Sequence, residues 1–302
     1  MKPFEDGYTI MKSMLFQPFD LTKWFVIGFA AFIAGHFSAG GFFPPLNFPG
    51  AQAHRRTDGS GLDVHQYGPF FWAMTAGVFL VVLIFIFVFL WIRARGTFVF
   101  TDCIVRNRAA IREPWREYRR EGNSLFLFLF AAGAIVCLVI SGLLVIGFIV
   151  ASVFHFSADD HVFVLIVLGA FVFVIYMSVV IAFSVISYFM PMVMYRQRCR
   201  SMEAFHIVIG LMWRDPGAFT LFGLFGILLV IGFAITASMV TCATCCVAAL
   251  PYIGTVILLP AFIWLRSFGL LFFRQFGPDC DVWGGADPFS PAPPPPVQAA
   301  TT

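Results

Sequence analysis

The chain has 302 residues, of which 60% are hydrophobic and only 12% are charged, and its mean hydropathy is +0.89. Soluble globular proteins are usually about one quarter charged, so this composition excludes that class and indicates a protein whose helices face lipid. The net charge of +3 says little by itself, because most basic residues gather in short segments between apolar runs.

Six apolar runs are long enough to cross a bilayer, which takes about 20 residues of helix. They cover residues 24–43, 69–92, 124–154, 161–190, 217–241 and 247–268. The sequence therefore predicts an all-α fold: a polytopic transmembrane bundle over residues 24–273, preceded by a cytoplasmic segment 1–23. Pro191 is expected to kink or end the fourth span.

The first run follows a segment with three acidic residues, which is a poor beginning for a cleaved signal peptide, so a retained span is predicted. Small residues recur on one face of this run, namely Gly28, Ala31, Gly35 and Ser38. Such a stripe lets another helix approach closely. His36 lies beside it, and it is either a packed or water-facing histidine or a contact for a substrate or metal.

Imidazole and carboxylate groups gather in two connections that are predicted to lie on the external side. The residues are His54, His65, His155, Asp159, Asp160 and His161. These groups would bind Zn²⁺ or another divalent ion if the two connections meet. The alternative is a pair of solvated turns with helix-capping aspartates.

The segment after the second run is rich in arginine and aromatic residues. Its candidate contact residues are Arg93, Arg95, Arg106, Arg108, Arg112, Trp115, Arg116, Arg119 and Arg120. We expect an interfacial helix with aromatic rings at the acyl boundary and guanidinium groups on anionic lipid headgroups. A soluble protein partner at this cytoplasmic face is the alternative. Nucleic acid binding is not expected, because the orientation of the spans already explains the excess of arginine.

The fifth run ends in Cys242-Ala-Thr-Cys245-Cys246. A redox-active pair of Cys242 and Cys245 is one interpretation, and close packing of small residues is the other. Seven cysteines are scattered along the chain without a regular spacing, which excludes a disulfide-stapled secreted domain.

Arg266 is the charged residue of the sixth run, and it is predicted to anchor the span by reaching the interface, with a substrate ligand as the alternative. All 16 acidic residues lie outside the six runs or at their edges, which argues against an ion-coupled transporter. Residues 274–302 form a Pro-rich tail that is predicted to be disordered and cytoplasmic.

The distribution of Lys and Arg predicts the orientation. With six spans, 17 of these residues fall on one side and 2 on the other. Short loops rich in Lys and Arg stay in the cytoplasm, so both termini are predicted to be cytoplasmic in a multi-pass protein of the cell (inner) membrane.

Three segments share a Pro and an aromatic residue that lead into a Phe-rich span. Pro18, Pro114 and Pro216 recur at intervals of 96 and 102 residues. The pattern suggests a threefold repeat of an interfacial helix plus a transmembrane hairpin. The alternative is that Pro and Phe are simply common at membrane interfaces.

At these segments the chain resembles uncharacterised bacterial six-span membrane proteins. The stretches that carry the likeness are QPFDLTKWF (17–25), RGTFVFTDCIVRNRAAIREPWREYRREGNSLF (95–126), RDPGAF (214–219) and LRSFGLLFFRQFGP (265–278). More loosely, it is similar to the membrane domain that accompanies some glycerophosphodiester phosphodiesterases. The resemblance implies a shared membrane fold with no established activity and no catalytic residues to carry over.

Motifs for metalloproteases, serine hydrolases, phosphate loops and dinucleotide binding are missing from the sequence, so an enzyme is the less favoured class and no cofactor is predicted. The leading hypothesis is a non-enzymatic scaffold or permease-like subunit that contacts anionic lipid, a partner protein or both. The second is transport or handling of a neutral or lipidic substrate. The third is a membrane enzyme that uses the external metal site or the cysteine pair. A polar cavity open to either side of the membrane would favour the second hypothesis, and a solidly packed bundle would favour the first.

Overall fold

The computed structural model describes residues 2–17, 19–36, 68–153, 158–244 and 251–284, and the regular elements in these ranges are helices. They are α1 (Lys2–Phe16), α2 (Leu21–Ile33), α3 (Gly68–Val105), α4 (Arg112–Glu117), α5 (Arg119–Val153), α6 (Ala158–Gln197), α7 (Ser201–Arg214), α8 (Pro216–Ala243), α9 (Pro251–Ile257), α10 (Leu259–Arg274) and the 3₁₀ turn η2 (Pro278–Cys280). The all-α prediction is confirmed for this part of the chain.

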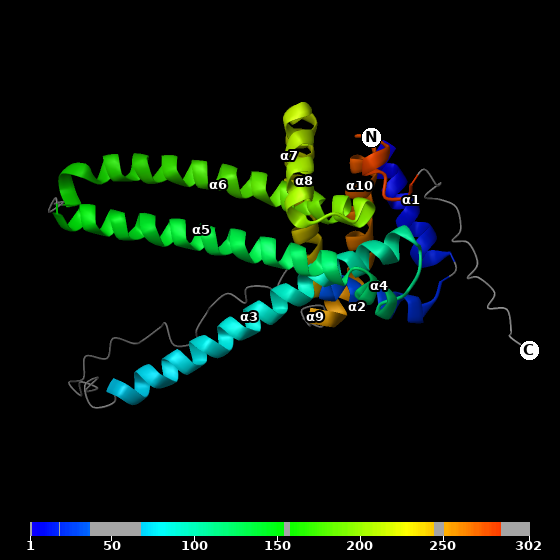
Figure 1. Cartoon of the computed structure of the whole chain (residues 1–302), viewed down its shortest axis with the longest axis horizontal. Coiled ribbons are helices and arrows are strands. Elements are labelled where there is room, and N and C mark those ends of the chain that lie inside the picture. The colour runs from blue at the N-terminus through cyan, green and yellow to red at the C-terminus, as the bar shows by residue number, and fades with distance from the viewer. Residues whose placement is uncertain (1, 18, 37–67, 154–157, 245–250, 285–302) are drawn as a thin grey trace, which may run out of the picture.

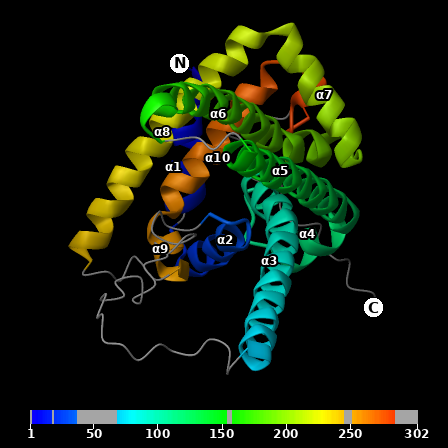
Figure 2. The ribbon, with the colours of Figure 1, turned by 90° about the vertical axis from the view of Figure 1, so that its left-hand side faces the viewer.

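The helices form a compact cluster from which long helices project (Figure 1). We call the compact part the cap; it consists of α1, α2, α4, α7, α9, α10 and the adjoining ends of α3, α5 and α6. The arms are residues 72–88 of α3, 129–143 of α5 and 172–184 of α6, which are mostly exposed. The arms of α5 and α6 extend from the cap in the same direction (Figure 1), whereas the arm of α3 points away from them (Figure 2).

Helix length explains this division. α3 and α6 have 38 and 40 residues, or about 57 and 60 Å at 1.5 Å per residue. The hydrocarbon core of a bilayer is only about 30 Å thick. Each helix therefore has enough length to cross a bilayer with its exposed apolar arm and still bury its other end in the cap.

Close packing holds the cap together around α2, α3 and α10. A Cβ atom on Gly96 of α3 would lie 2.5 Å from the carbonyl carbon of Ile33, so α2 and α3 meet at backbone contact. A Cβ atom on Gly28 of α2 would lie 2.8 Å from the Cγ2 atom of the Val256 side chain of α9. The predicted close approach at the small-residue stripe of the first run is confirmed at Gly28. On the other side of the cap, α1 buries Ile10, Met14 and its neighbours against α10.

In the described part of the chain, four helices are long and apolar enough to cross a membrane: Trp72–Val105, Arg119–Leu143, Val172–Gln197 and Pro216–Ala243. They correspond to the predicted spans 69–92, 124–154, 161–190 and 217–241. The apolar helices are compatible with a membrane protein, but the six-span prediction is not confirmed. The two other predicted spans, 24–43 and 247–268, correspond to shorter helices.

The local backbone conformation ends or interrupts the helix in both of these predicted spans. α2 has 13 residues and ends before Gly35, whose φ of +84° suits glycine, with a hydrogen bond of 3.0 Å from the His36 amide to the Ala31 carbonyl. The rest of the predicted span 24–43 lies outside the described residues. In the last predicted span, the helix is interrupted at Leu258 between α9 and α10. Pro260 lies in the first turn of α10.

Proline positions are otherwise accommodated. α6 continues through Pro191 to Gln197, so this residue does not end the helix. α7 buries Ser201, Ala204 and Val208 on one face. Short helices precede longer apolar ones at α4–α5 and α7–α8, but the threefold repeat is not confirmed.

Candidate functional site

A buried carboxylate organises the basic end of α3. Asp102 has 0% exposure and receives hydrogen bonds from the Tyr195 hydroxyl on Oδ1 (3.0 Å) and from Arg108 on Oδ2 (3.1 Å). Arg106 forms an ion pair with Oδ1 at 3.1 Å. A guanidinium group therefore faces each oxygen of this buried carboxylate, and these pairs connect α3 with the segment that follows it.

Glu117 of α4 extends this cluster toward α6. It pairs with Arg106 at 3.1 Å and with Arg198, whose guanidinium carbon lies 4.0 Å from the centre of the Tyr118 ring. Burial acts to raise the pKa of Glu117, but the hydrogen bond from Arg198 and the charge of Arg106 outweigh it, and its pKa is lowered. We call Asp102, Arg106, Arg108, Glu117, Tyr195 and Arg198 the Asp102 network. Its positive and negative charges face one another.

The predicted contact residues thus fall into different environments. Arg106 and Arg108 belong to the Asp102 network, while Arg95 contacts the Asn123 side chain (2.9 Å) and the rings of Trp91 and Trp115. Four others are exposed and have no ion pair among the described residues, namely Arg112, Arg116, Arg119 and Arg120. Arg93 is also exposed, near Gly35. These arginines are the part of the predicted lipid or partner surface that remains available to a ligand.

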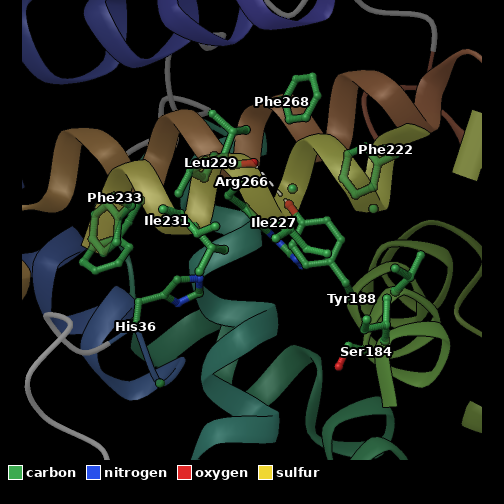
Figure 3. A pocket seen from close by; sticks show the side chains of 18 residues that line it. His36, Ser184, Tyr188, Phe222, Ile227, Leu229, Ile231, Phe233, Arg266 and Phe268 are labelled. Atoms are coloured by element: carbon green, nitrogen blue, oxygen red, sulfur yellow. Dashed lines mark hydrogen bonds between the residues drawn. The ribbon is translucent and has the colours of Figure 1, made fainter. Parts of the chain in front are cut away.

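A cavity of about 600 Å³ lies between α6, α8 and α10 (Figure 3). Its walls are almost entirely apolar, with Ile181 and Val185 from α6, and Ile227 and Val230 from α8. Phe222 of α8 stacks on Phe268 of α10 at 5.4 Å between ring centres, which joins these two helices beside the cavity. The volume falls in the usual range for ligand pockets, about 300–1,000 Å³.

Four polar side chains line this otherwise apolar cavity, namely Arg266, His36, Ser184 and Tyr188. Arg266 of α10 is only 4% exposed; its guanidinium donates a hydrogen bond to the Thr101 hydroxyl (2.9 Å) and lies 5.2 Å from the centre of the Tyr188 ring. Its Nε is buried without a hydrogen-bond partner. No acidic side chain of the described residues forms an ion pair with it. The predicted role as an interface anchor is wrong, because this side chain is buried between helices.

His36 is the second polar group. Its ring lies 5.0 Å from the ring of Phe100 and 5.3 Å from that of Phe262, and its Nδ1 is buried without a hydrogen-bond partner. Figure 3 shows His36 at one end of the pocket and Tyr188 and Ser184 toward the other. The hydroxyl of Tyr188 donates to the Leu265 carbonyl (3.1 Å), which positions its ring beside Arg266.

Glycines keep the cavity open on its α8 side. Gly226 lines the cavity, and a Cβ atom there would meet no atom within 4 Å. Gly232 is equally unobstructed but is not part of the lining. A side chain at the first position would enter the cavity, while one at the second would not.

The other predicted sites are not tested. His54, His65 and His155 lie outside the described residues, as do the side chains of Asp159, Asp160 and His161. Cys242 is an exposed free thiol, and Cys245 lies outside the described residues. Sequence reasoning noticed Arg266 and His36 separately but did not bring them to one cavity, because their elements are more than 200 residues apart in the chain.

A family of unknown function, DUF7544, matches residues 2–277. The chain belongs to this family. No curated protein and no solved structure matches it. The family carries no assigned activity, and the looser likeness to the membrane domain of some glycerophosphodiester phosphodiesterases is not shown by this match.

Proposed function

We propose that this member of DUF7544 is a multi-pass membrane protein that binds and handles a lipidic ligand in the pocket between α6, α8 and α10. The observation that carries the proposal is the apolar cavity of about 600 Å³ between two helices that are long enough to cross a bilayer. Lining residues such as Ile227 and Val230 are also 45% and 62% exposed, so the cavity opens onto the apolar outer surface. A lipid chain could enter sideways from the bilayer.

The sequence alone ranked a scaffold or permease-like subunit above lipid handling. The cavity reverses that order, because a scaffold has no need for a pocket with two buried polar side chains. The position in the cell membrane with both termini in the cytoplasm remains part of the proposal, and it rests on the distribution of Lys and Arg.

A matched pair of glycine variants tests the proposal. Gly226→Leu places a side chain in the cavity, and Gly232→Leu places the same side chain on the same helix outside it. Native mass spectrometry of the full chain, extracted gently from membranes, should find lipid on the wild type and on Gly232→Leu. Gly226→Leu should lose most of it. Equal lipid retention in both variants would contradict the proposal.

A second function has support from a different surface. The exposed arginines Arg112, Arg116, Arg119 and Arg120 suit contact with anionic headgroups or with an acidic face of a protein partner. Replacing all four with Gln should weaken association with vesicles that contain phosphatidylglycerol, measured by cosedimentation at low salt. Unchanged association would remove this candidate.

A further inference from the structure

Among the residues that the structure describes, the charge of Arg266 has no counterpart in its surroundings. Its side chain is 4% exposed, and the polar groups that contact it are the Thr101 hydroxyl and the Tyr188 ring, both uncharged. A guanidinium removed from water is strongly destabilised unless an anion or a full set of hydrogen bonds replaces the water. An anion that enters from the pocket would supply the missing charge.

A purely structural role explains Arg266 less well. The hydrogen bond to Thr101 joins α10 to α3, but Thr101 already donates its own hydroxyl to the Thr97 carbonyl (2.8 Å). An uncharged donor such as Gln would make the same link without burying a charge. The unused Nε of Arg266 belongs to the fork of N–H groups with which arginine binds a carboxylate or phosphate through two oxygens.

The remainder of the pocket suits a hydrocarbon chain. Its lining is apolar apart from Arg266, His36, Ser184 and Tyr188. A methylene group takes roughly the volume of a water molecule, about 30 Å³, so a cavity of about 600 Å³ holds roughly twenty such groups. This is the size of one acyl chain with its headgroup, and a second chain would have to lie outside on the helices.

From these observations we infer that the ligand is an anionic amphiphile whose carboxylate or phosphodiester group binds Arg266 while one acyl chain fills the cavity. The inference rests on the proposed function and adds the chemical class of the ligand. His36 lies on the same cavity with an unpaired Nδ1 and is placed to contact the polar end of the chain or the headgroup.

Two probes with the same chain separate headgroup from hydrocarbon. The purified full chain in a non-ionic detergent is titrated with oleate and with oleyl alcohol, and binding is measured by native mass spectrometry. We expect the wild type to bind oleate at least about tenfold more tightly than the alcohol, because the charge-assisted pair with Arg266 forms only with oleate. Arg266→Gln should abolish that preference, and Arg214→Gln, which removes an exposed arginine at the end of α7 outside the pocket, should retain it.

The outcomes distinguish the two proposals. Equal affinity of the wild type for oleate and oleyl alcohol would overturn the headgroup inference and leave the lipid pocket standing. A preference that persists in Arg266→Gln would overturn the assignment to this residue. The wild-type comparison holds even if that variant fails to fold. If neither probe binds, or if Gly226→Leu binds both as well as Gly232→Leu does, the proposed function itself fails.

Further probes identify the source of the anion. Phosphatidylglycerol that displaces oleate would indicate a membrane phospholipid as the ligand, and failure to displace it would indicate a free fatty carboxylate. Inorganic phosphate lacks a chain and should not compete at millimolar concentration. Competition by phosphate alone would overturn the inference that an amphiphile is required.

Discussion

The Asp102 network and the pocket around Arg266 each bury one charged group, a carboxylate in the network and a guanidinium in the pocket, but they differ in charge balance. In the network, Arg106 and Arg108 face the buried carboxylate of Asp102, with 3.1 Å between paired atoms. In the pocket, Arg266 faces a hydroxyl, an aromatic ring and an apolar cavity. The difference teaches that a buried charge paired with opposite charges of the chain stabilises the fold, whereas a buried guanidinium beside a cavity without a carboxylate is available to an external anion.

Substitution of the buried carboxylate should have the largest effect. Asp102→Asn would leave Arg106, Arg108 and the Tyr195 hydroxyl around a neutral group, and we expect a loss of about 3 kcal/mol in the free energy of unfolding. Thermal unfolding in detergent measures it. Glu113→Gln is the control, because Glu113 pairs with Arg108 from a side chain that is 71% exposed. A loss no greater than that of the control would show that the network does not stabilise the cap.

Substitution of Arg266 should have a smaller effect of the opposite sign. In delipidated protein, Arg266→Met removes an unpaired buried charge, so stability should be unchanged or rise by about 1 kcal/mol. Oleate should then stabilise the wild type against heat but not the variant. A loss of stability as large as that of Asp102→Asn would show that Arg266 stabilises the fold. It would contradict the distinction drawn between this residue and the Asp102 network.

The smallest expected effect depends on pH. The pKa of Glu117 is lowered from its ordinary value of 4.5, so its pairing stabilises the fold above that pH and the contribution is lost as pH falls through the folded-state pKa. Because Glu117 is partly exposed, Glu117→Gln should cost only about 0.5–1 kcal/mol at pH 7. Unfolding midpoints of the variant and the wild type should converge below pH 4.5. A difference in midpoint that stays constant as the pH falls below 4.5 would contradict the assignment of the effect to the Glu117 carboxylate. Arg112→Gln, an exposed arginine outside the network, should differ little from the wild type at any pH.

Much of the helical architecture was predictable, because long apolar runs and arginine-rich connections are local features of the sequence. The runs at α3, α5, α6 and α8 became helices long enough to cross a membrane. The first and last runs did not, and the cause at the first is a local turn: the glycine conformation at Gly35 ends the helical path of α2. Apolar composition by itself does not show where such a turn falls.

The site was less predictable, because its contacts join distant parts of the chain. Arg266 and Thr101 are 165 residues apart, and Asp102 and Tyr195 are 93 apart. The sequence placed Asp102 outside the predicted spans and Arg266 within one, but whether each is paired depends on which helices the fold brings together. The sequence therefore identified the arginines but could not separate those that have a carboxylate partner from those that lack one.

The most direct test of the lipid pocket is an experimental map of the protein prepared in its native membrane lipids. We predict elongated density along α8 past Gly226, with its polar end within hydrogen-bonding distance of the Arg266 guanidinium. A map in which side chains of α6 and α8 close the cavity, with no density beside Arg266, would contradict the proposal that this protein binds a lipidic ligand.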